Sequence, residues 1–424
     1  MTFKIALVGC GGMGRRHAHG YIELRKYFDT VSMTAVCDLH ADVAATVADE
    51  IGEATGLRPD IYTDFDEMLA EVDLDGVAIV TSTPMHHIFA IKAMEAGLHV
   101  ITEKPMGLTL KACRQMRDSS QATGKVIAVA ENYRRDPMNR LTRALIDAGA
   151  IGTLYFALDI NVGSSGGAVM HSTVWRAKKE QAGGMPLDAG VHNADMLLYL
   201  MGDADNVFAE TSTFEPNRTL RPMREVAPGL ADMYSHRKED GYTTGDEVEQ
   251  TAVDSAFAVI RFKSGAIGQL MMTDTSHGQS LGVSTISGSR GTMYRPRSRS
   301  GESPRIVRND GTDITGDALL DLVPDFRLDD ITSTLWNGAR RISSYEMDFR
   351  EIDSKILAYE YLDMVQAAES GGQPEVGPQE GMDALALAYA LMESGVSGMP
   401  VTVEDVADGR ATKFQDEIDT EMGI

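Results

Sequence analysis

The first 130 residues alternate between short apolar runs and amphipathic stretches. The apolar runs have the length of strands buried on both faces of a parallel sheet, and they lie at 3–8, 31–37, 76–80, 98–101 and 125–129. Helical patterns lie between them, at 13–26, at 41–51 before Gly52, after a cap by Asp64 through Leu69, at 85–95 and at 109–121. Parallel strands need crossovers of about a dozen residues, so this order predicts a doubly wound sheet of about six strands.

The pattern changes after residue 130. Helices are predicted at 137–148, 186–201 and 356–393, the last of them interrupted near 371–378. Alternating runs, which are typical of antiparallel sheet, lie at 154–162, 252–262, 266–273 and 283–287. A glycine- and serine-rich segment at 163–167 and polar stretches at 216–247 and 294–343 are expected to form loops or lids.

We therefore predict an α/β protein with two domains. Residues 1–130 would form a Rossmann domain with a doubly wound parallel sheet. Residues 131–424 would form an α+β domain with an open, largely antiparallel sheet, and its C-terminal helices would pack back on the first domain.

Composition and charge exclude several classes of protein. With 43% hydrophobic and 24% charged residues the chain is typical of a soluble globular protein. Its 39 basic and 63 acidic residues give a net charge of -24, which opposes binding to nucleic acid or to an anionic membrane surface. It has no apolar run of the roughly 20 residues that span a bilayer and no signal-peptide layout, so we expect a cytoplasmic protein. Three cysteines without metal-ligand spacing, Cys10, Cys37 and Cys113, predict reduced core thiols and no metal site.

A glycine loop follows the first predicted strand and opens the first predicted helix. In this GxGxxG pattern Gly9 allows a tight turn, Gly11 lets a pyrophosphate approach the backbone, and Gly14 allows close packing of helix and strand. The phosphate charge would face the helix N-terminus at Gly12 and Met13. This context predicts a dinucleotide site.

Asp38 ends the second predicted strand, 24 residues after Gly14, near the spacing of roughly 20 expected for a ribose-binding acid. A carboxylate there accepts hydrogen bonds from the ribose hydroxyls and repels a 2'-phosphate. Because Leu39 and His40 supply no Lys or Arg, NAD is favoured over NADP. The alternative is that Asp38 caps the helix beginning at Ala41.

Two further segments carry ionisable groups. Glu103-Lys104-Pro105 follows the fifth predicted strand at the sheet edge where α/β proteins bind ligands. Asp188 and His192 are four residues apart on a predicted helix, so the carboxylate could orient the imidazole, with Asp195 as a further neighbour. Such a pair can also be purely structural.

Over residues 3–202 the sequence resembles the glucose-fructose oxidoreductase / inositol dehydrogenase (Gfo/Idh/MocA) family. The resemblance rests on the glycine loop, on residues 77–84 with His86 and His87, on Glu103-Lys104-Pro105, and on the helix with Asp188, His192 and Asp195. It implies a Rossmann domain, an open-faced substrate domain, tightly held NAD(P), a small carbohydrate substrate, and a homo-oligomer, dimer or tetramer, formed through the C-terminal sheet.

The resemblance also implies roles for individual residues. Lys104 would lie near the nicotinamide and the substrate hydroxyl, His192 would be the acid/base, and Asp188 would hold the substrate or the lysine. An imidazole with an ordinary pKa of about 6.5 suits removal of a hydroxyl proton. The cofactor side would include Thr81, Thr83, Pro84, His87 and Glu103. Substrate contacts would come from Tyr133, Arg134, His171, Trp175 and Arg176, which could equally be surface or core residues.

A cluster of arginines stands out in this acidic chain. Six arginines and one acid, Glu302, lie between Arg290 and Arg308; the other four arginines are Arg295, Arg297, Arg299 and Arg305. Guanidinium groups bind carboxylate or phosphate in a bidentate manner, so an anion site is one interpretation. Salt bridges to acids of the same chain or of another subunit are the other.

Three functions follow from the resemblance. The leading one is NAD-dependent oxidation, or the reverse reduction, of a secondary hydroxyl of a sugar, sugar acid or glycoside, at ring C3. The second is a redox glycosidase, in which oxidation, elimination, hydration and reduction release an aglycone from a glycoside that could be anionic. The third is a non-catalytic NAD-linked sensor, against which the presence of Lys104 and His192 argues.

Overall fold

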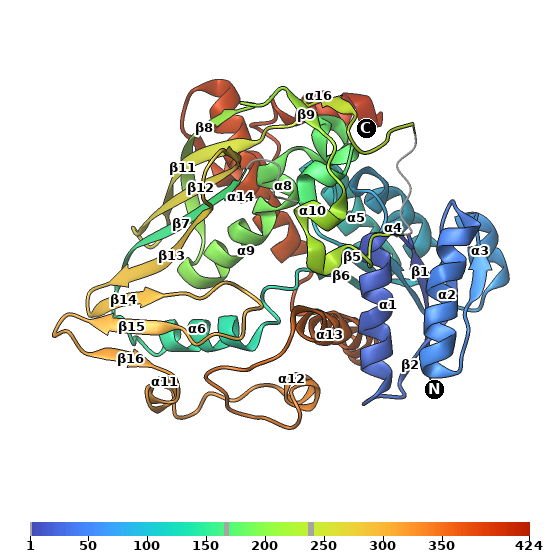
Figure 1. Ribbon diagram of the computed structural model, residues 1–424, viewed down its shortest axis with the longest axis horizontal. Coiled ribbons are helices and arrows are strands. Elements are labelled where there is room, and N and C mark those ends of the chain that lie inside the picture. The colour runs from blue at the N-terminus through green and yellow to red at the C-terminus, as the bar shows by residue number, and fades with distance from the viewer. Residues whose placement is uncertain (1, 165–168, 236–240) are drawn as a thin grey trace.

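The computed structural model describes residues 2–164, 169–235 and 241–424. Its N-terminal part holds six parallel strands in the order β3-β2-β1-β4-β5-β6 (Figure 1). The strands are β1 (Phe3–Val8), β2 (Val31–Cys37), β3 (Asp60–Tyr62), β4 (Gly76–Ile79), β5 (His99–Glu103) and β6 (Ile127–Ala130). The helices are α1 (Gly12–Arg25), α2 (Ala41–Thr55), α3 (Phe65–Glu71), α4 (His86–Glu95) and α5 (Leu110–Thr123). The predicted Rossmann architecture is confirmed.

Capping residues mark several of the helix boundaries in this domain. The Asp64 side chain accepts a hydrogen bond from the Glu67 N–H, as predicted for a cap of α3. The expected end of α2 at Gly52 is wrong, because this helix continues to Thr55 and stops at Gly56, which adopts a left-handed conformation with φ 76°. A glycine inside a helix is tolerated, whereas the left-handed position after its end favours one.

The second sheet has nine strands in the order β16-β15-β14-β13-β7-β12-β11-β8-β17 (Figure 1). They are β7 (Leu154–Ser164), β8 (Ala204–Ser212), β11 (Ser255–Phe262), β12 (Ile267–Ser276), β13 (Leu281–Gly288), β14 (Gly291–Tyr294), β15 (Arg305–Arg308), β16 (Asp313–Thr315) and β17 (Val401–Thr402). All neighbours are antiparallel except β12 and β7, which pair in parallel. The prediction of a largely antiparallel sheet is confirmed.

Both polar stretches contain more regular structure than expected. Residues 294–343 include β15, β16, α11 (Ala318–Asp321) and α12 (Asp330–Leu335). Residues 216–247 include the short strand β9 (Asn217–Thr219), paired with β10 (Glu247–Glu249), and α10 (Met223–Val226). These short elements depend on pairing with distant partners, so local periodicity does not reveal them. Within the glycine- and serine-rich segment, β7 extends to Ser164, and residues 165–168 lie outside the described part of the chain.

The inner face of the second sheet is covered by helices. The helix expected at 186–201 is broken at Ala189 into α8 (Met185–Asp188) and α9 (Gly190–Met201), and α6 (Pro137–Asp147) packs beside α9. Helix α14 (Pro378–Ser397) packs on β8 and α9. One apolar core runs from the Rossmann strands through α14 to this inner face.

The C-terminal helix α13 (Phe349–Ser370) lies beside α1, as Figure 1 shows near the centre of the molecule. The two helices meet closely at Gly20, where an added Cβ would lie 2.5 Å from Leu357 Cβ. The remaining helices are α7 (Lys179–Ala182), α15 (Val403–Ala407) and α16 (Gln415–Met422). Thus α13 packs with the first domain in space, although it lies within the second domain's part of the chain.

The described residues contain no helix that is both long and apolar enough to cross a membrane. They also contain no group of three His, Cys, Asp or Glu side chains placed to hold a metal ion. The three cysteines are buried free thiols.

Candidate active site

The glycine loop connects β1 to α1 at the carboxyl edge of the parallel sheet. Gly9 has φ 92°, and a Cβ there would lie 2.5 Å from the Val80 carbonyl oxygen. A Cβ on Gly14 would lie 1.9 Å from the Gly9 oxygen, so both positions require glycine. At Gly11 no atom lies within 4 Å of an added Cβ. The open space above Gly11, at the N-terminus of α1, fits the pyrophosphate of a dinucleotide.

A cavity of about 470 Å³ continues from this loop toward β2 and β3. The Asp38 carboxylate lines it and accepts hydrogen bonds from the backbone N–H of Cys10 at 2.8 Å and of His40 at 3.0 Å. The residue at the N-cap of α2 is His40, so Asp38 does not cap this helix. Fixed in this way, the carboxylate is placed to accept hydrogen bonds from an adenosine ribose.

Replacing Asp38 by serine is expected to change the coenzyme preference. Hydrogen bonds to a charged group contribute about 1.5–3 kcal/mol, so the KM for NAD should rise roughly 10- to 100-fold and the preference over NADP should shrink. Steady-state kinetics with both coenzymes measures this. Glu53→Gln, an exposed carboxylate on α2, is the matched control and should leave both KM values unchanged. An unchanged NAD preference in the serine variant would remove the ribose role.

A second cavity, of about 270 Å³, lies where the two domains meet. It is lined from the first domain by Gly11, Gly12, Met13, Arg16, Val80, Thr81, Ser82, Thr83, His86, Glu103 and Lys104, and from the start of the second by Asn132. The other side is lined by Trp175, Arg176, Asp188, His192, Tyr234 and Arg299. The glycine loop, Lys104 and His192 therefore line one common cavity, which we call the interdomain cavity.

Lys104 follows β5 and contacts Asp188 at the end of α8. Its Nζ donates a hydrogen bond to the Asp188 backbone oxygen at 2.7 Å and lies 3.5 Å from Asp188 Oδ1. The second carboxylate oxygen accepts a hydrogen bond from Arg176 Nε at 2.6 Å. Although burial opposes ionisation, Arg176 and Lys104 hold the pKa of Asp188 well below its usual range. Asp188 is thus a buried carboxylate between two cations.

His192 lies on α9 and is oriented by Glu131, which directly follows β6. Its Nδ1 lies 2.7 Å from both carboxylate oxygens of Glu131, and its ring stacks on Tyr133 with centroids 4.2 Å apart. Burial lowers the pKa of His192, while the Glu131 charge partly offsets this. Because Nδ1 is taken by a carboxylate, the neutral imidazole carries its proton there and presents the Nε2 lone pair.

The expected pairing of Asp188 with His192 on one helix is wrong. The break at Ala189 separates the two residues, and their partners differ. Asp188 contacts Lys104 and Arg176, whereas His192 contacts Glu131. Sequence reasoning missed Glu131, although its place directly after a parallel strand was an available signal. Asp195 is not among the residues that line the cavity, and it pairs with Arg134 at 2.6 Å.

The other predicted residues divide into two groups. Thr81, Thr83, Glu103, Trp175 and Arg176 line the interdomain cavity. The cavity lining does not include Pro84, His87, Tyr133, Arg134 or His171.

His86 takes the place expected for His87, with its ring nitrogens 3.0 Å from the Pro105 oxygen and 3.2 Å from the Thr81 oxygen. The peptide bond between Lys104 and Pro105 is cis. His171 lines a separate cavity together with Arg218.

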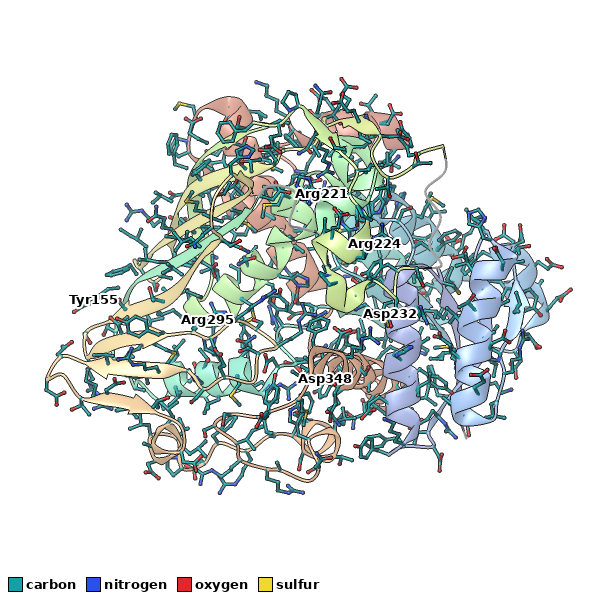
Figure 2. All side chains as sticks on the ribbon, viewed as in Figure 1. Tyr155, Arg221, Arg224, Asp232, Arg295 and Asp348 are labelled. Carbon is teal, nitrogen blue, oxygen red and sulfur yellow. The ribbon has the colours of Figure 1, made fainter. Side chains whose placement is uncertain are left out.

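Tyr234 is a cavity residue that the sequence did not reveal. It belongs to the polar stretch expected to form a loop or lid, of which residues 236–240 lie outside the described part of the chain. A Cβ on Gly12 would lie 2.1 Å from the Tyr234 ring, so this ring rests directly on the glycine loop. The backbone oxygen of Asp232 accepts a hydrogen bond from Arg15 on α1 at 2.5 Å, and Figure 2 shows Asp232 beside this helix.

Together the glycine loop, a carboxylate in the adjoining cavity, and a lysine and histidine in one cavity are typical of an NAD-dependent oxidoreductase. Residues 3–131 match the family model described as the oxidoreductase family with an NAD-binding Rossmann fold. Residues 139–294 match the GFO/IDH/MocA C-terminal domain. The chain belongs to the Gfo/Idh/MocA family, and the predictions of an enzyme and of NAD as its cofactor are confirmed.

Several characterised proteins are similar to this chain. Levoglucosan dehydrogenase of Pseudarthrobacter phenanthrenivorans is 29% identical over 320 residues, 74% of this chain and 79% of the relative. Myo-inositol 2-dehydrogenase of Thermotoga maritima is 25% identical over 407 residues, 95% of this chain and 99% of the relative. A solved structure of levoglucosan dehydrogenase in complex with NADH superposes with a TM-score of 0.73 at 23% identity, covering 95% of this chain and 99% of that one.

Proposed function

We propose that this enzyme oxidises a secondary hydroxyl of a sugar or glycoside with NAD, or catalyses the reverse reduction. One observation carries the proposal: an ammonium and an imidazole from different domains line the same cavity as the glycine loop. Its relatives include a levoglucosan dehydrogenase and a myo-inositol 2-dehydrogenase, which supports a polyhydroxylated substrate. The test is a panel of sugars, sugar acids, inositols and glycosides with NAD, followed by NADH absorbance.

The mechanism divides the work between His192 and Lys104. Bound NAD⁺ supplies the hydride acceptor. The Nε2 of His192 accepts the hydroxyl proton, while Glu131 holds the ring and stabilises its charged form. The Lys104 ammonium stabilises the developing alkoxide, an electrostatic effect that is strongest where water is excluded. Asp188 positions Lys104 through the hydrogen bond to its backbone oxygen.

Replacing Glu131 by glutamine tests the positioning of His192. The variant keeps the size of the side chain but removes the charge that raises the pKa of His192. The pKa of the imidazole should therefore fall further, moving the acid limb of the kcat/KM profile to lower pH. The maximal rate should drop about 10- to 100-fold because the ring is held less firmly. An acid limb that stays in place or moves to higher pH would contradict this role.

We place the oxidised hydroxyl at ring C3. The D-glucoside 3-dehydrogenase of Escherichia coli supports this position, with 28% identity over 264 residues, 62% of this chain and 68% of the relative. Reducing the enzymatic product of a methyl glucoside with borodeuteride should introduce deuterium at C3. Deuterium at another carbon would exclude C3.

A redox glycosidase is the second candidate. A Glycosyl hydrolase family 109 protein of Shewanella baltica is 29% identical over 155 residues, 36% of this chain and 33% of the relative. Such an enzyme returns its hydride in each cycle and needs only catalytic NAD. Release of aglycone from an aryl glycoside without net NADH would favour it over the dehydrogenase.

The outer face of the nine-stranded sheet supports a homo-oligomer, a dimer or tetramer. Val259 lies opposite Phe208 and Ile267 opposite Phe156, and all four side chains are exposed. Tyr155, 56% exposed, lies at the edge of the molecule in Figure 2. An apolar sheet face of this kind is typical of a contact between copies.

Replacing Val259 by lysine is expected to dissociate the oligomer. The charge would be buried without a partner at the centre of the contact, whereas on a free sheet face it would be solvated. Light scattering coupled to size exclusion should give the mass of one chain for the variant and a multiple of it for the wild type. Glu210→Lys changes the charge at a more polar position on the same face, and it should weaken assembly less. A monomeric wild type would contradict the proposal.

A further inference from the structure

Another cavity lies next to the interdomain cavity, on the Tyr133 side of the stacked Tyr133 and His192 rings. It has a volume of about 480 Å³, enough for a monosaccharide, and lies between β7, β13, α9 and the segment after β14. Its polar lining residues are Tyr133, Asp159, Asn161, Asn193, Ser280, Ser284, Arg295, Arg297 and Ser298. We call it the Arg295 cavity, and Figure 2 labels this residue beside the sheet.

The Arg295 side chain is buried but poorly satisfied. It is only 6% exposed, and its Nε has no hydrogen-bond partner among the described residues. Its nearest acid is Asp159, at 3.8 Å from Nη1, which is longer than a hydrogen bond. Asp159 instead accepts a hydrogen bond from Asn193 at 3.0 Å. A buried guanidinium without hydrogen bonds destabilises the protein unless an acceptor enters beside it.

Two other arginines of the 290–308 cluster form salt bridges with acids of the same chain. Arg299 lies 3.1 Å from Asp353, and Arg305 lies 2.6 Å from Asp313. For these two the interpretation as intrachain salt bridges is correct. Arg295 differs because no acid among the described residues lies within hydrogen-bond distance of its guanidinium group.

The charges of the cavity favour a monoanion. Among the described residues that line the cavity, Arg295 and Arg297 face one acid, Asp159, in a chain whose net charge is -24. A carboxylate matches the planar guanidinium and this single excess positive charge better than a dianionic phosphate does. The amide and hydroxyl side chains of Asn161, Asn193 and Ser284 suit the hydroxyl groups of a sugar.

The two cavities share three chain segments. The interdomain cavity is lined by Asn132, His192 and Arg299. Their neighbours in the sequence, Tyr133, Asn193 and Ser298, line the Arg295 cavity. We propose that the Arg295 cavity binds the carboxylate of a sugar acid next to the catalytic histidine. The carboxylate could belong to a distal unit of the substrate or to a separate sugar acid molecule. Only the sugar character of the ligand rests on the proposed function.

The test uses D-glucuronate as the probe and D-glucose as its neutral match, in the absence of NAD. Calorimetric titration and thermal unfolding are measured for the full-length wild type, Arg295→Met and Arg297→Gln. We expect glucuronate to bind at least 10-fold more tightly than glucose and to raise the melting temperature of the wild type. Arg295→Met should lose this binding while its own melting temperature stays equal or rises. Arg297→Gln, at the exposed mouth, should bind severalfold more weakly.

Equal binding of glucuronate and glucose, or full glucuronate binding by Arg295→Met, would overturn the proposal. If Arg295→Met fails to fold, Arg297→Gln provides the comparison. In that case the proposal is overturned if Arg297→Gln binds glucuronate as tightly as the wild type does. Glucuronate that competes with an oxidised sugar identifies a distal substrate unit, whereas simultaneous binding identifies a separate ligand. Repeating the titration with Lys104→Met separates this proposal from the proposed dehydrogenase activity. The Arg295 cavity can bind glucuronate even if the enzyme oxidises no sugar.

Discussion

Replacing Lys104 by methionine is expected to lower kcat about 10³-fold. Among the described residues that line the interdomain cavity Lys104 is the only lysine, and methionine keeps its length without its charge. Removing one group that stabilises a developing oxyanion typically costs 10²–10³ in rate. Single-turnover reduction of NAD by a saturating sugar substrate measures the effect.

The Lys104 variant needs two controls. Lys111→Met removes an exposed lysine from α5 and should leave kcat unchanged within about twofold. NAD affinity of Lys104→Met, measured by quenching of protein fluorescence, should change by less than about 10-fold, because the glycine loop and Asp38 remain. A variant that turns over within a few fold of wild type would remove Lys104 from the mechanism.

Replacing His192 by asparagine should lower kcat/KM by about 10²–10⁴. Asparagine can still donate a hydrogen bond to Glu131 but cannot accept and release a proton near neutral pH. In the wild type the neutral imidazole is the base, so kcat/KM should fall as the pH drops through the lowered pKa of His192. In the variant this acid limb should disappear.

The matched control is His277→Asn, a histidine whose side chain is 80% exposed. It should retain both the rate and the acid limb of the wild type. The informative readout is the pH profile from about pH 4 to 9, because a purely structural histidine would change the rate without changing its pH dependence. An unaltered acid limb in His192→Asn would assign the base to another group.

The sequence predicted the Rossmann domain well because its determinants are local. Apolar runs mark buried strands, and the glycine loop is specified by a few neighbouring residues whose backbone geometry excludes side chains. Lys104 and His192, which line one cavity, could be predicted as site residues because each belongs to a recognisable segment. Asp38 could be predicted because its distance from the glycine loop is set by one βαβ unit.

The partners within the site could not be predicted in the same way. Glu131 and His192 are 61 residues apart, and the helix break that directs Asp188 toward Lys104 occurs without proline or a predicted turn. Tyr234 reaches the glycine loop from the other domain, through a segment without periodicity. These contacts depend on how the domains meet, so local patterns do not contain them.

The central claim is that Lys104 and His192 serve hydride transfer from a sugar hydroxyl to NAD. It is tested most directly by incubating limiting glycoside with excess NAD and measuring NADH, ketosugar and free aglycone in the same reaction. We predict one NADH and one ketosugar per substrate consumed with the wild type, no aglycone, and none of these products with Lys104→Met. Substrate loss with free aglycone but without accumulated NADH, or equal NADH formation by the variant, would contradict the account.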